Sequence, residues 1–328
     1  MASRCAGLAA VVRSAALHDT SLDTGGVLWL EHVNMIVGSR EAAERFYIGF
    51  LGCTADPSSS FHVNLGRQQF HLSEGEPHVI TGCFGVAVPA LDTVRARAAE
   101  AAAALQGTSF ACRDHGHALE ATCPWGNTFF VYSAAVPAEA LAGASKENMP
   151  VMASRQAGWD HGMGVHGNQP GLRFVEVRVP PGAAQGVGRF YEEMLGAHVV
   201  YDEGGKGAVV AMGPGVHAIF TDIDGVGAEE LGRLRGVHLC IYIYGFRQAY
   251  ERLHARGLTW TNPRFVHLDT CDSWEEAQAS RQFRFRYIHD PRQEQQSDSG
   301  APPLLELEHE TRACRHFQFM KQVEYRGV

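Results

Sequence analysis

Lysine is scarce in this sequence of 328 residues, and several familiar functional signals are missing from it. It occurs only as Lys146, Lys206 and Lys321, and the formal net charge is −8. Nothing in that balance favours nucleic acid or an anionic membrane surface as a partner. No apolar run approaches the roughly 20 residues that span a bilayer. A nucleophile elbow, a phosphate-binding glycine loop and a zinc-finger spacing are also missing. The composition predicts a soluble globular protein.

The cysteine pattern favours a reducing compartment. Eight cysteines occur, no two of them form a CxxC pair, and several stand inside apolar runs, where small buried thiols are common. We therefore expect a cytoplasmic protein. The start of the chain leaves an alternative, because residues 1–18 contain two arginines, two serines and no acidic residue, as mitochondrial or plastid transit segments do. Residues 1–26 are thus either an N-terminal tail or a transit segment.

One sequence pattern occurs four times. Its most visible form is Arg-Phe-Tyr followed, after three residues, by Leu-Gly, and this phrase ends at Gly52 and again at Gly196. Each copy follows an apolar, strand-like run and precedes several more such runs. The same order recurs over residues 28–74, 82–132, 171–220 and 237–308. Because internal repeats decide the architecture of a chain, we expect four copies of one structural module.

The spacing of apolar residues predicts the elements of each module. Phe46 and Phe50 are four residues apart, and Phe246, Tyr250 and Leu253 follow the i, i+4, i+7 pattern of one helix face. The closing runs of each module are short, apolar or alternating, and bounded by glycine and proline, which indicates strands. Each module therefore reads as a strand, a helix and further strands, and the fold class is α+β.

The first module has a recognisable opening. It begins with HVNMIV at residues 32–37, continues with Phe46-Tyr47 and ends its helix at Leu51-Gly52. This order resembles the opening module of the vicinal oxygen chelate superfamily, the group of glyoxalases, bleomycin-resistance proteins and extradiol dioxygenases.

Two later turns extend the resemblance. PWGN at residues 124–127 is similar to the Asp-Pro-x-Gly-Asn turn that precedes the last strand of a module in that family, with Cys123 in place of Asp. HDP at residues 289–291 and LEL at residues 305–307 resemble the same turn and strand, separated by an insertion. The resemblance covers residues 27–312.

A division of the chain follows from the resemblance. Four βαβββ modules are expected to form two glyoxalase-like domains, residues 27–135 and residues 171–312, each built from two successive modules. Residues 136–170 are then a linker, and residues 313–328 a C-terminal tail. The oligomeric state is left open.

The resemblance also implies a divalent metal cofactor. Each pair of modules resembles a curved sheet whose concave face carries the metal, held by side chains from the first and last strands of the modules. The cofactor is expected to be Fe, Mn, Zn or Ni, because such ions bind and polarise the adjacent oxygens of a small-molecule substrate.

The first half offers few ligands for such a metal. His32 stands at the family's first-strand position, and His71 stands in a closing strand of the same module. The matching positions of the second module hold Cys83 and Phe130. Phenylalanine cannot bind a metal, and a thiol is unusual for this oxygen chemistry. We therefore expect the site of the first half to be empty, with a two-histidine site as the alternative.

The second half keeps more of the expected ligands. Phe174 replaces the family's first histidine, but His238 and Glu306 occupy two ligand positions, and strand alternation puts Glu176 on the same face as residue 174. The predicted metal ligands are Glu176, His238 and Glu306. The alternative is that Glu306 belongs to an acidic outer face of an edge strand, since the acidic residues around it recur at every second position.

Two functions are compatible with these patterns. The first is a metal-dependent lyase, isomerase or dioxygenase acting on a small oxygenated molecule, in which Tyr287 and His289 supply a general acid or base near the metal. The second is a metal-free, non-catalytic protein that keeps the fold and binds a small molecule or takes part in an assembly. One scaffold of this kind hosts many reactions, so the sequence names no substrate.

Overall fold

The computed structural model describes residues 26–134, 170–294 and 302–319, apart from residues 58, 60, 67, 203 and 214. The expected N-terminal tail or transit segment, nearly all of the linker and the end of the C-terminal tail lie outside these residues. In the described part of the chain, no helix is both long and apolar enough to cross a membrane.

Three modules have the same order of elements. The first contains β1 (Val27–Val37), α2 (Arg40–Ala43), the π-helix η2 (Glu44–Phe50), β2 (Thr54–Ala55), β3 (His62–Leu65) and β4 (Gln68–Glu74). The second contains β5 (Gly82–Val88), α3 (Leu91–Ala104), β6 (Ala111–Asp114), β7 (Ala118–Thr122) and β8 (Thr128–Ser133). The third contains β9 (Gly171–Val179), α6 (Ala183–Leu195), β10 (Val199–Tyr201), β11 (Gly207–Ala211) and β12 (His217–Asp222), and α7 (Ala228–Gly232) follows it.

The fourth module departs from this order. It contains β13 (His238–Ile243), α8 (Phe246–His254), α9 (Trp274–Ser280), β14 (Gln282–Ile288), α10 (Pro291–Glu294) and β15 (Leu305–Ala313). Where the other modules have a further hairpin strand, the described residues here form only an isolated bridge between Thr259 and Phe285. The segment between that bridge and α9 is therefore not held in the sheet as an edge strand.

The glycines that close the repeated phrase end their helices for a physical reason. Gly196 caps α6 with a φ of 66°, and Gly52 follows η2 with a φ of 82°. Positive φ values cost glycine little because it has no Cβ, so the chain can leave the helix there at once.

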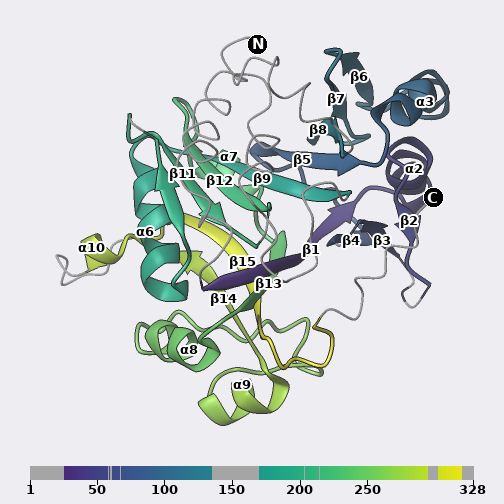
Figure 1. The fold of residues 1–328 in the computed structure, drawn as a ribbon. Coiled ribbons are helices and arrows are strands. Elements are labelled where there is room, and N and C mark those ends of the chain that lie inside the picture. Colours follow the sequence, from purple (N-terminus) through teal and green to yellow (C-terminus); the bar gives the residue numbers. More distant parts are fainter. Residues whose placement is uncertain are drawn as a thin grey trace.

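The modules pair in two mixed sheets (Figure 1). One sheet, called sheet A, has the strand order β14-β15-β13-β1-β4-β3-β2, and the other, sheet B, has the order β10-β11-β12-β9-β5-β8-β7-β6. The central pairs, β1 with β13 and β5 with β9, are antiparallel. The predicted α+β fold of four modules is confirmed. The expectation that successive modules share a sheet is wrong, because the first module pairs with the fourth and the second with the third.

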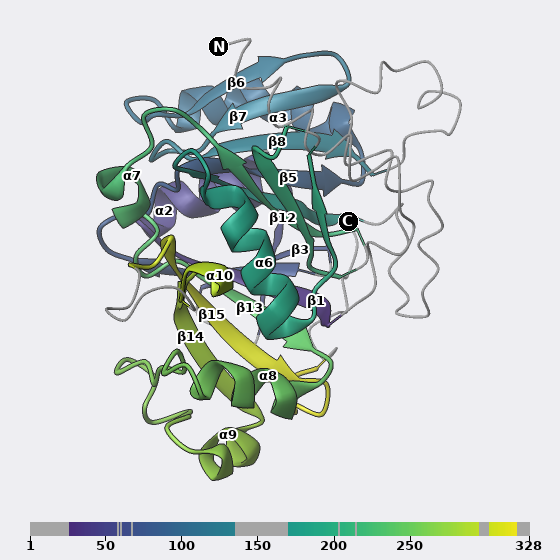
Figure 2. The ribbon, with the colours of Figure 1, turned by 90° about the vertical axis from the view of Figure 1, so that its left-hand side faces the viewer.

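Successive modules meet through their helices instead of their strands. In the first half η2 packs against α3, and in the second half α6 packs against α8 (Figure 2). Aromatic side chains fill the space between the sheets, as in the edge-on contact of Phe46 with Phe129 and the contact of Phe190 with Phe285. Each half of the chain thus contributes one module to each sheet. The division into domains at residues 27–135 and 171–312 stays a prediction.

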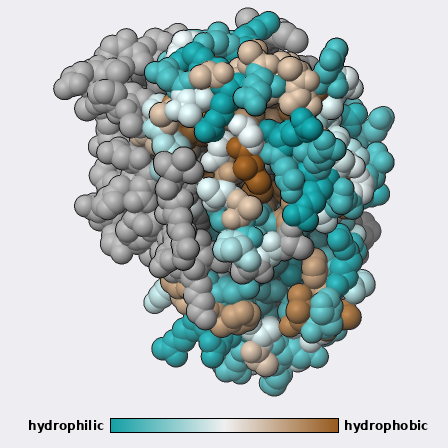
Figure 3. All heavy atoms as spheres, turned by 90° about the vertical axis from the view of Figure 1, so that its right-hand side faces the viewer, coloured by the Kyte–Doolittle hydropathy of each residue, from teal (hydrophilic) through white to brown (hydrophobic). Residues whose placement is uncertain are grey.

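The two sheets share one hydrophobic core, and strand alternation decides which side chains enter it. In β13, Leu239 and Ile241 face the core while His238 lies on the opposite face, and in β15 Leu307 faces the core while Glu308 does not. The outer surface is different in character. Figure 3 shows one face on which hydrophilic residues predominate and hydrophobic residues gather in small areas.

A partly buried ion pair joins the third module to the fourth. Arg189 on α6 donates through Nε and Nη2 to the two carboxylate oxygens of Asp290, at 3.1 and 2.6 Å. Asp290 lies between β14 and α10 and also accepts from the backbone N–H of Arg292. The hydrogen bonds from Arg189 hold the pKa of Asp290 below its usual value.

Asp290→Asn should lower the free energy of unfolding by about 2 kcal/mol at pH 7, because hydrogen bonds to charged groups contribute roughly 1.5–3 kcal/mol. The folded-state pKa is depressed, so this stabilisation is present above the unfolded-state value of about 4 and is lost as the pH falls below it. Chemical denaturation of both proteins at pH 7 and pH 3 checks this. Glu41→Gln, which removes an exposed pair with Arg45, is the control and should have little effect. If the unfolding free energies of the Asp290→Asn variant and the wild type differed equally at pH 7 and pH 3, the stabilisation would not come from the ionised carboxylate.

Candidate metal centre

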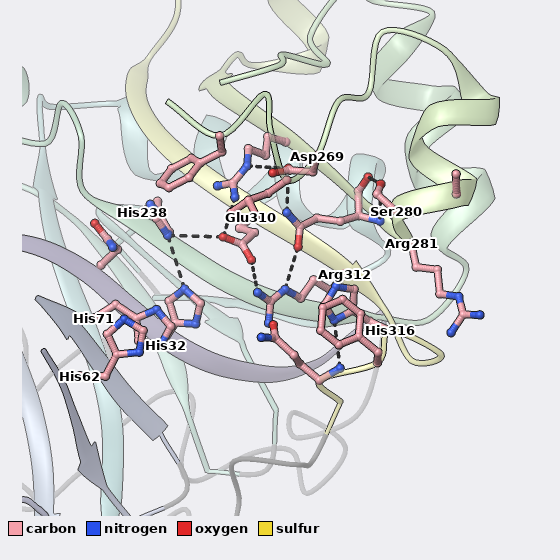
Figure 4. Close-up of a pocket in the computed structure, with 18 residues that line it drawn as sticks. His32, His62, His71, His238, Asp269, Ser280, Arg281, Glu310, Arg312 and His316 are labelled. Carbon is pink, nitrogen blue, oxygen red and sulfur yellow. Dashed lines mark hydrogen bonds and ion pairs between the residues drawn. The ribbon is translucent and has the colours of Figure 1, made fainter. Parts of the chain in front are cut away.

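The face of sheet A that points away from the shared core forms the floor of a cavity of about 690 Å³. Alternation along each strand sends polar side chains to this face, whereas their neighbours are core residues. The polar and charged lining residues are His32, Asn34, His62, His71, His238, Asp269, Ser280, Arg281, Gln282, Arg284, Glu310, Arg312, His316 and Gln318. Figure 4 shows that the histidines of the first module, His32, His62 and His71, meet His238 of the fourth module at one end of this cavity.

Three metal-binding side chains converge on the floor of the cavity. His32 on β1 and His238 on β13 bring their Nε2 atoms to 3.4 Å from each other. The same Nε2 of His238 lies 3.6 Å from Oε2 of Glu310 on β15. One ligand atom from each residue lies within 4.8 Å of the other two, and all three residues are buried (Figure 4).

A β-bulge puts a further carboxylate beside His32. Leu30 pairs with Ile241 and His32 with Cys240, so Glu31 is an extra residue in the ladder. Leu30 and Val33 both belong to the core, which leaves Glu31 and His32 together on the cavity side. Oε1 of Glu31 lies 3.3 Å from Nδ1 of His32. This contact favours the tautomer with a proton on Nδ1 and a lone pair on Nε2.

Two arginines hold the carboxylates of the site. Arg312 donates through Nη1 to Glu31 at 2.8 Å and forms an ion pair with Oε1 of Glu310. Arg284 donates through Nη2 to Oε2 of Glu310 at 2.7 Å and through Nη1 to Glu308 at 2.9 Å. The Nε of Arg284 donates to Asp269 at 2.9 Å. Arg312 therefore joins the carboxylate next to His32 to the carboxylate next to His238.

The charges of this buried cluster do not cancel. Its four carboxylates are Glu31, Asp269, Glu308 and Glu310, and its two guanidiniums belong to Arg284 and Arg312. All six side chains are buried. Four negative charges against two positive charges leave a formal excess of two negative charges. Such an excess is costly away from water unless a further cation compensates for it.

Burial and neighbouring charges decide the protonation of the converging groups. Burial keeps the pKa of His238 well below its usual value, although the carboxylate of Glu310 opposes this effect. Burial alone would raise the pKa of Glu310, but Arg312 and Arg284 hold it well below its usual value. At neutral pH, His238 is therefore neutral and Glu310 ionised.

A stack of three imidazoles borders the site. The ring of His71 lies 3.6 Å from that of His32 and 3.5 Å from that of His62, measured between centroids, and all three rings are nearly parallel. Nε2 of His71 is 2.8 Å from Oε1 of Gln69. The amide nitrogen of Gln69 already donates to Asp56, so Oε1 is the acceptor and Nε2 of His71 carries the proton. Its Nδ1 therefore has a free lone pair.

The predicted ligands do not meet. Glu176 lies on β9 in sheet B, where it accepts a hydrogen bond from Cys83, while His238 lies on β13 in sheet A. Glu306 shares the face of Glu310 on β15, but it pairs with Arg235 and Arg286 and does not line the cavity. Glu306 and Glu310 are four positions apart on β15, a distance of about 13 Å along a strand.

The predicted acid and base residues lie elsewhere. Tyr287 on β14 packs under the guanidinium of Arg286, and its ring is 6.5 Å from that of His289. Neither residue lines the cavity of sheet A. Their catalytic role stays a prediction that the geometry of this cavity does not support.

Sequence reasoning missed the combination of His32 with Glu310. The expectation that His32 shares a site with Cys83 and Phe130 is wrong, because β1 pairs with β13 and not with β5. The alternation of acidic residues in β15 was a usable signal for Glu310. It could not identify which glutamate lies beside His238, since the parallel register of β13 with β15 decides this.

Comparisons with known proteins find similarity among solved structures. No family model matches the sequence, and no curated protein matches it. Similar solved structures include a candidate dioxygenase from Bacillus subtilis, glyoxalase I from Zea mays and the CppA protein from Streptococcus pneumoniae. They are 14%, 12% and 11% identical to this chain, with TM-scores of 0.47, 0.46 and 0.43. The matches cover 88%, 86% and 88% of this chain and 86%, 92% and 100% of those chains. The fold itself rests on the strand pairings described above.

The corresponding face of sheet B has different chemistry. Cys83 on β5 pairs with Glu176 on β9, and the thiol donates to the buried carboxylate at 3.1 Å. Two residues further along β5, Gly85 pairs with Phe174, whose ring fills the space that a Cβ on Gly85 would need. Phe174 stands where the resemblance implies a histidine, and here it packs against the sheet.

Gly85→Ala should lower the free energy of unfolding by roughly 1–3 kcal/mol, the usual cost of overpacking a filled interior. Gly232→Ala is the matched control, because no atom lies within 4 Å of an added Cβ there. Gly232 stands in a helix, where alanine is favoured, so the control should be neutral or slightly stabilising. Thermal and chemical denaturation of both variants measure the difference. Equal stability of the two would mean that the ring of Phe174 moves aside without cost.

Proposed function

We propose that this chain binds one divalent metal ion between His32, His238 and Glu310 and acts on a small oxygenated molecule in the cavity above it. The observation that carries the proposal is the convergence of two imidazole nitrogens and one carboxylate oxygen from three strands of sheet A. Two histidines and one carboxylate are the donor set of many non-haem iron sites, and manganese, zinc and nickel accept the same donors.

The spacing of the donor atoms fits a metal ion. Metal bonds to imidazole or carboxylate are about 2.0–2.2 Å long, so two donors on one ion are roughly 3.0–3.5 Å apart. In the structure, Nε2 of His238 lies 3.4 Å from His32 and 3.6 Å from Glu310, and the donor atoms of all three residues lie within 4.8 Å of one another. Only small side-chain movements are therefore needed to bind an ion.

The buried charge also fits a metal ion. A divalent cation would bring the formal charge of the carboxylate and guanidinium cluster from −2 to zero. In the described part of the chain, neutral groups also donate to these carboxylates, as Asn262 does to both oxygens of Glu308 at 2.9 and 3.1 Å.

The residues of the chain have separate roles in this proposal. A bound metal ion supplies a Lewis acid that polarises the oxygens of a substrate. Glu31 orients His32, and Arg312 and Arg284 orient Glu310. The lone pair on Nδ1 of His71 can accept a proton.

One observation favours a second function, that of a metal-free binding protein. Both carboxylate oxygens of Glu310 already interact with guanidiniums, Oε2 with Arg284 and Oε1 with Arg312. Guanidiniums can take the place of a cation in a buried site. In that case the cavity would bind its small molecule without catalysis, and protein purified without chelators would contain no stoichiometric metal.

The metal proposal predicts a specific pattern of variants. His32→Ala, His238→Ala and Glu310→Gln should each lower metal affinity at least 100-fold, because losing one of three protein donors leaves the ion incompletely coordinated. The wild-type chain should retain about one ion of Fe, Mn, Zn or Ni. Elemental analysis of protein purified without chelators, and titration of the apoprotein with Zn²⁺ or Co²⁺, measure both quantities.

Glu176→Gln and Glu306→Gln are the matched controls for that experiment. Both remove a carboxylate from a strand of the same two sheets, and neither residue lies among the converging donors. Metal content should stay at the wild-type level in both. If Glu176→Gln lost the ion while His32→Ala kept it, the ion would be bound in sheet B and the proposal would be wrong.

The support of His32 by Glu31 gives a further prediction. Glu31→Gln should weaken metal binding about 10-fold, because outer partners of a ligating histidine typically contribute 10–100-fold to affinity. It should leave one ion per chain at saturation. Competition with a coloured chelator measures the affinity, and the absorption spectrum of the Co²⁺ protein should change with the orientation of His32. An unchanged affinity and spectrum would show that Glu31 serves only its ion pair with Arg312.

A further inference from the structure

One carboxylate in the cavity has an oxygen without a hydrogen-bond donor. Asp269 lines the cavity, and its side chain is 5% exposed. Its Oδ2 accepts from Nε2 of Gln282 at 2.7 Å and from Nε of Arg284 at 2.9 Å. Its Oδ1 is buried, and among the residues that the structure describes none donates a hydrogen bond to it. Because an unpaired buried carboxylate oxygen is costly, this atom indicates a group that enters the cavity from outside.

The loop that carries Asp269 fixes the position of this acceptor. It lies between the isolated bridge of the fourth module and α9. The backbone N–H of Asp269 donates to the carbonyl of Phe265 at 3.0 Å. Near the ends of the loop, the N–H of Cys271 donates to Oγ1 of Thr261, also at 3.0 Å. Arg284 on β14 holds the carboxylate from the sheet, so Oδ1 is a preorganised acceptor.

The charges next to Asp269 do not balance. One guanidinium, that of Arg284, serves the three carboxylates of Asp269, Glu308 and Glu310. Glu310 also pairs with Arg312 and belongs to the proposed metal site. Asp269 and Glu308 then share Arg284, and two negative charges against one positive charge leave a formal −1. A monovalent cation at Oδ1 would bring this part of the cluster to zero.

The other cationic groups of this region do not bond to Oδ1. Arg281 lines the cavity, but it donates to the backbone carbonyl of Arg315, and its guanidinium lies away from Asp269 (Figure 4). Arg264 is exposed and does not line the cavity. Burial lowers the pKa of His316 to about 4, so this lining imidazole is neutral at pH 7. Oδ1 therefore accepts its hydrogen bond from a ligand.

We infer that Asp269 recognises an amine: the molecule that occupies the cavity carries a protonated amino group, and this group donates a hydrogen bond to Oδ1. An ammonium group supplies both the donor and the positive charge, whereas a hydroxyl group supplies only the donor. A carboxylate presents acceptor oxygens and is disfavoured at this position. Asp269 and Glu310 bind the same guanidinium, so the amino group lies close to the proposed metal without using its donors. The inference rests on the proposed use of this cavity for a small molecule, but not on the metal.

Four benzyl compounds test the inference by ligand-observed NMR on the full chain, treated with a chelator so that no probe binds through a metal. Benzylamine is protonated at pH 7, benzyl alcohol is an uncharged donor, benzyltrimethylammonium has the charge without an N–H, and benzoate is an anion. Benzylamine should bind at least about 10-fold more tightly than each of the others, because only it forms a hydrogen bond between two charged groups. Equal binding of benzylamine and either benzyl alcohol or benzyltrimethylammonium overturns the inference. Absence of saturable benzylamine binding at millimolar concentration also overturns it.

Asp269→Asn identifies the acceptor. Gln282 and Arg284 both donate to the Oδ2 position, so the amide carbonyl takes that place and the amide nitrogen, a donor, replaces Oδ1. Benzylamine affinity should fall at least about 10-fold, while benzyl alcohol binds as before.

Glu308→Gln is the matched control for that variant. It removes one negative charge from the same guanidinium, but Glu308 does not line the cavity, and Asn262 donates to both of its oxygens. Benzylamine affinity should stay within about threefold of the wild type, because the control keeps the acceptor Oδ1. Equal losses in the two variants would show that benzylamine responds to the charge of the cluster as a whole, and the role of Asp269 would be wrong.

The outcomes separate the inference from the metal proposal. The Zn²⁺-loaded chain should keep the preference for benzylamine over benzyl alcohol. If the chain binds no metal, the metal proposal fails, and the order of the four probes on the chelator-treated protein still decides the inference. If benzylamine displaces Zn²⁺ in proportion to its own binding, the amine occupies the metal donors and its assignment to Asp269 is wrong. Should Asp269→Asn lose the circular-dichroism spectrum of the folded protein, the four probes on the wild type decide alone.

Discussion

The antiparallel pairing of β1 with β13 is the constraint on which the site depends. These strands come from the first and the fourth module, more than two hundred residues apart, and their register places His32 opposite Cys240 and next to His238. Neither half of the chain contains the three donors by itself. The bulge in β1 adds Glu31 to the same face, so the pairing determines both the donors and the group that orients one of them.

Buried charge distinguishes the cavity face of sheet A from the corresponding face of sheet B. In sheet A four buried carboxylates outnumber two guanidiniums, and the excess can be compensated by a divalent ion. In sheet B the buried carboxylate of Glu176 accepts hydrogen bonds from Cys83 and Thr221 and lies 3.6 Å from Arg178. Phe174 packs over Gly85 beside it. The cavity face of sheet A thus carries a cluster of buried charged groups, while the ring of Phe174 covers the corresponding face of sheet B.

The missing hairpin strand of the fourth module shapes one side of the cavity. In the other modules this part of the chain adds an edge strand, whereas here it keeps one bridge and then turns over the cavity with Phe265 and Leu268. A departure from the repeat therefore supplies the wall that an unmodified module would lack. Regular strands place the donors, and the irregular segment shapes the space above them.

The sequence by itself determined the local structure. Apolar spacing and the Leu-Gly helix ends identified four modules of strand, helix and strands, because periodicity and positive-φ glycines are properties of neighbouring residues. Alternation in β15 likewise indicated that its glutamates share one face. Tertiary structure alone decided that the first module pairs with the fourth, which moved His32 into the site and Glu176 out of it. Strand partners and register arise from packing between distant segments, and no short-range pattern encodes them.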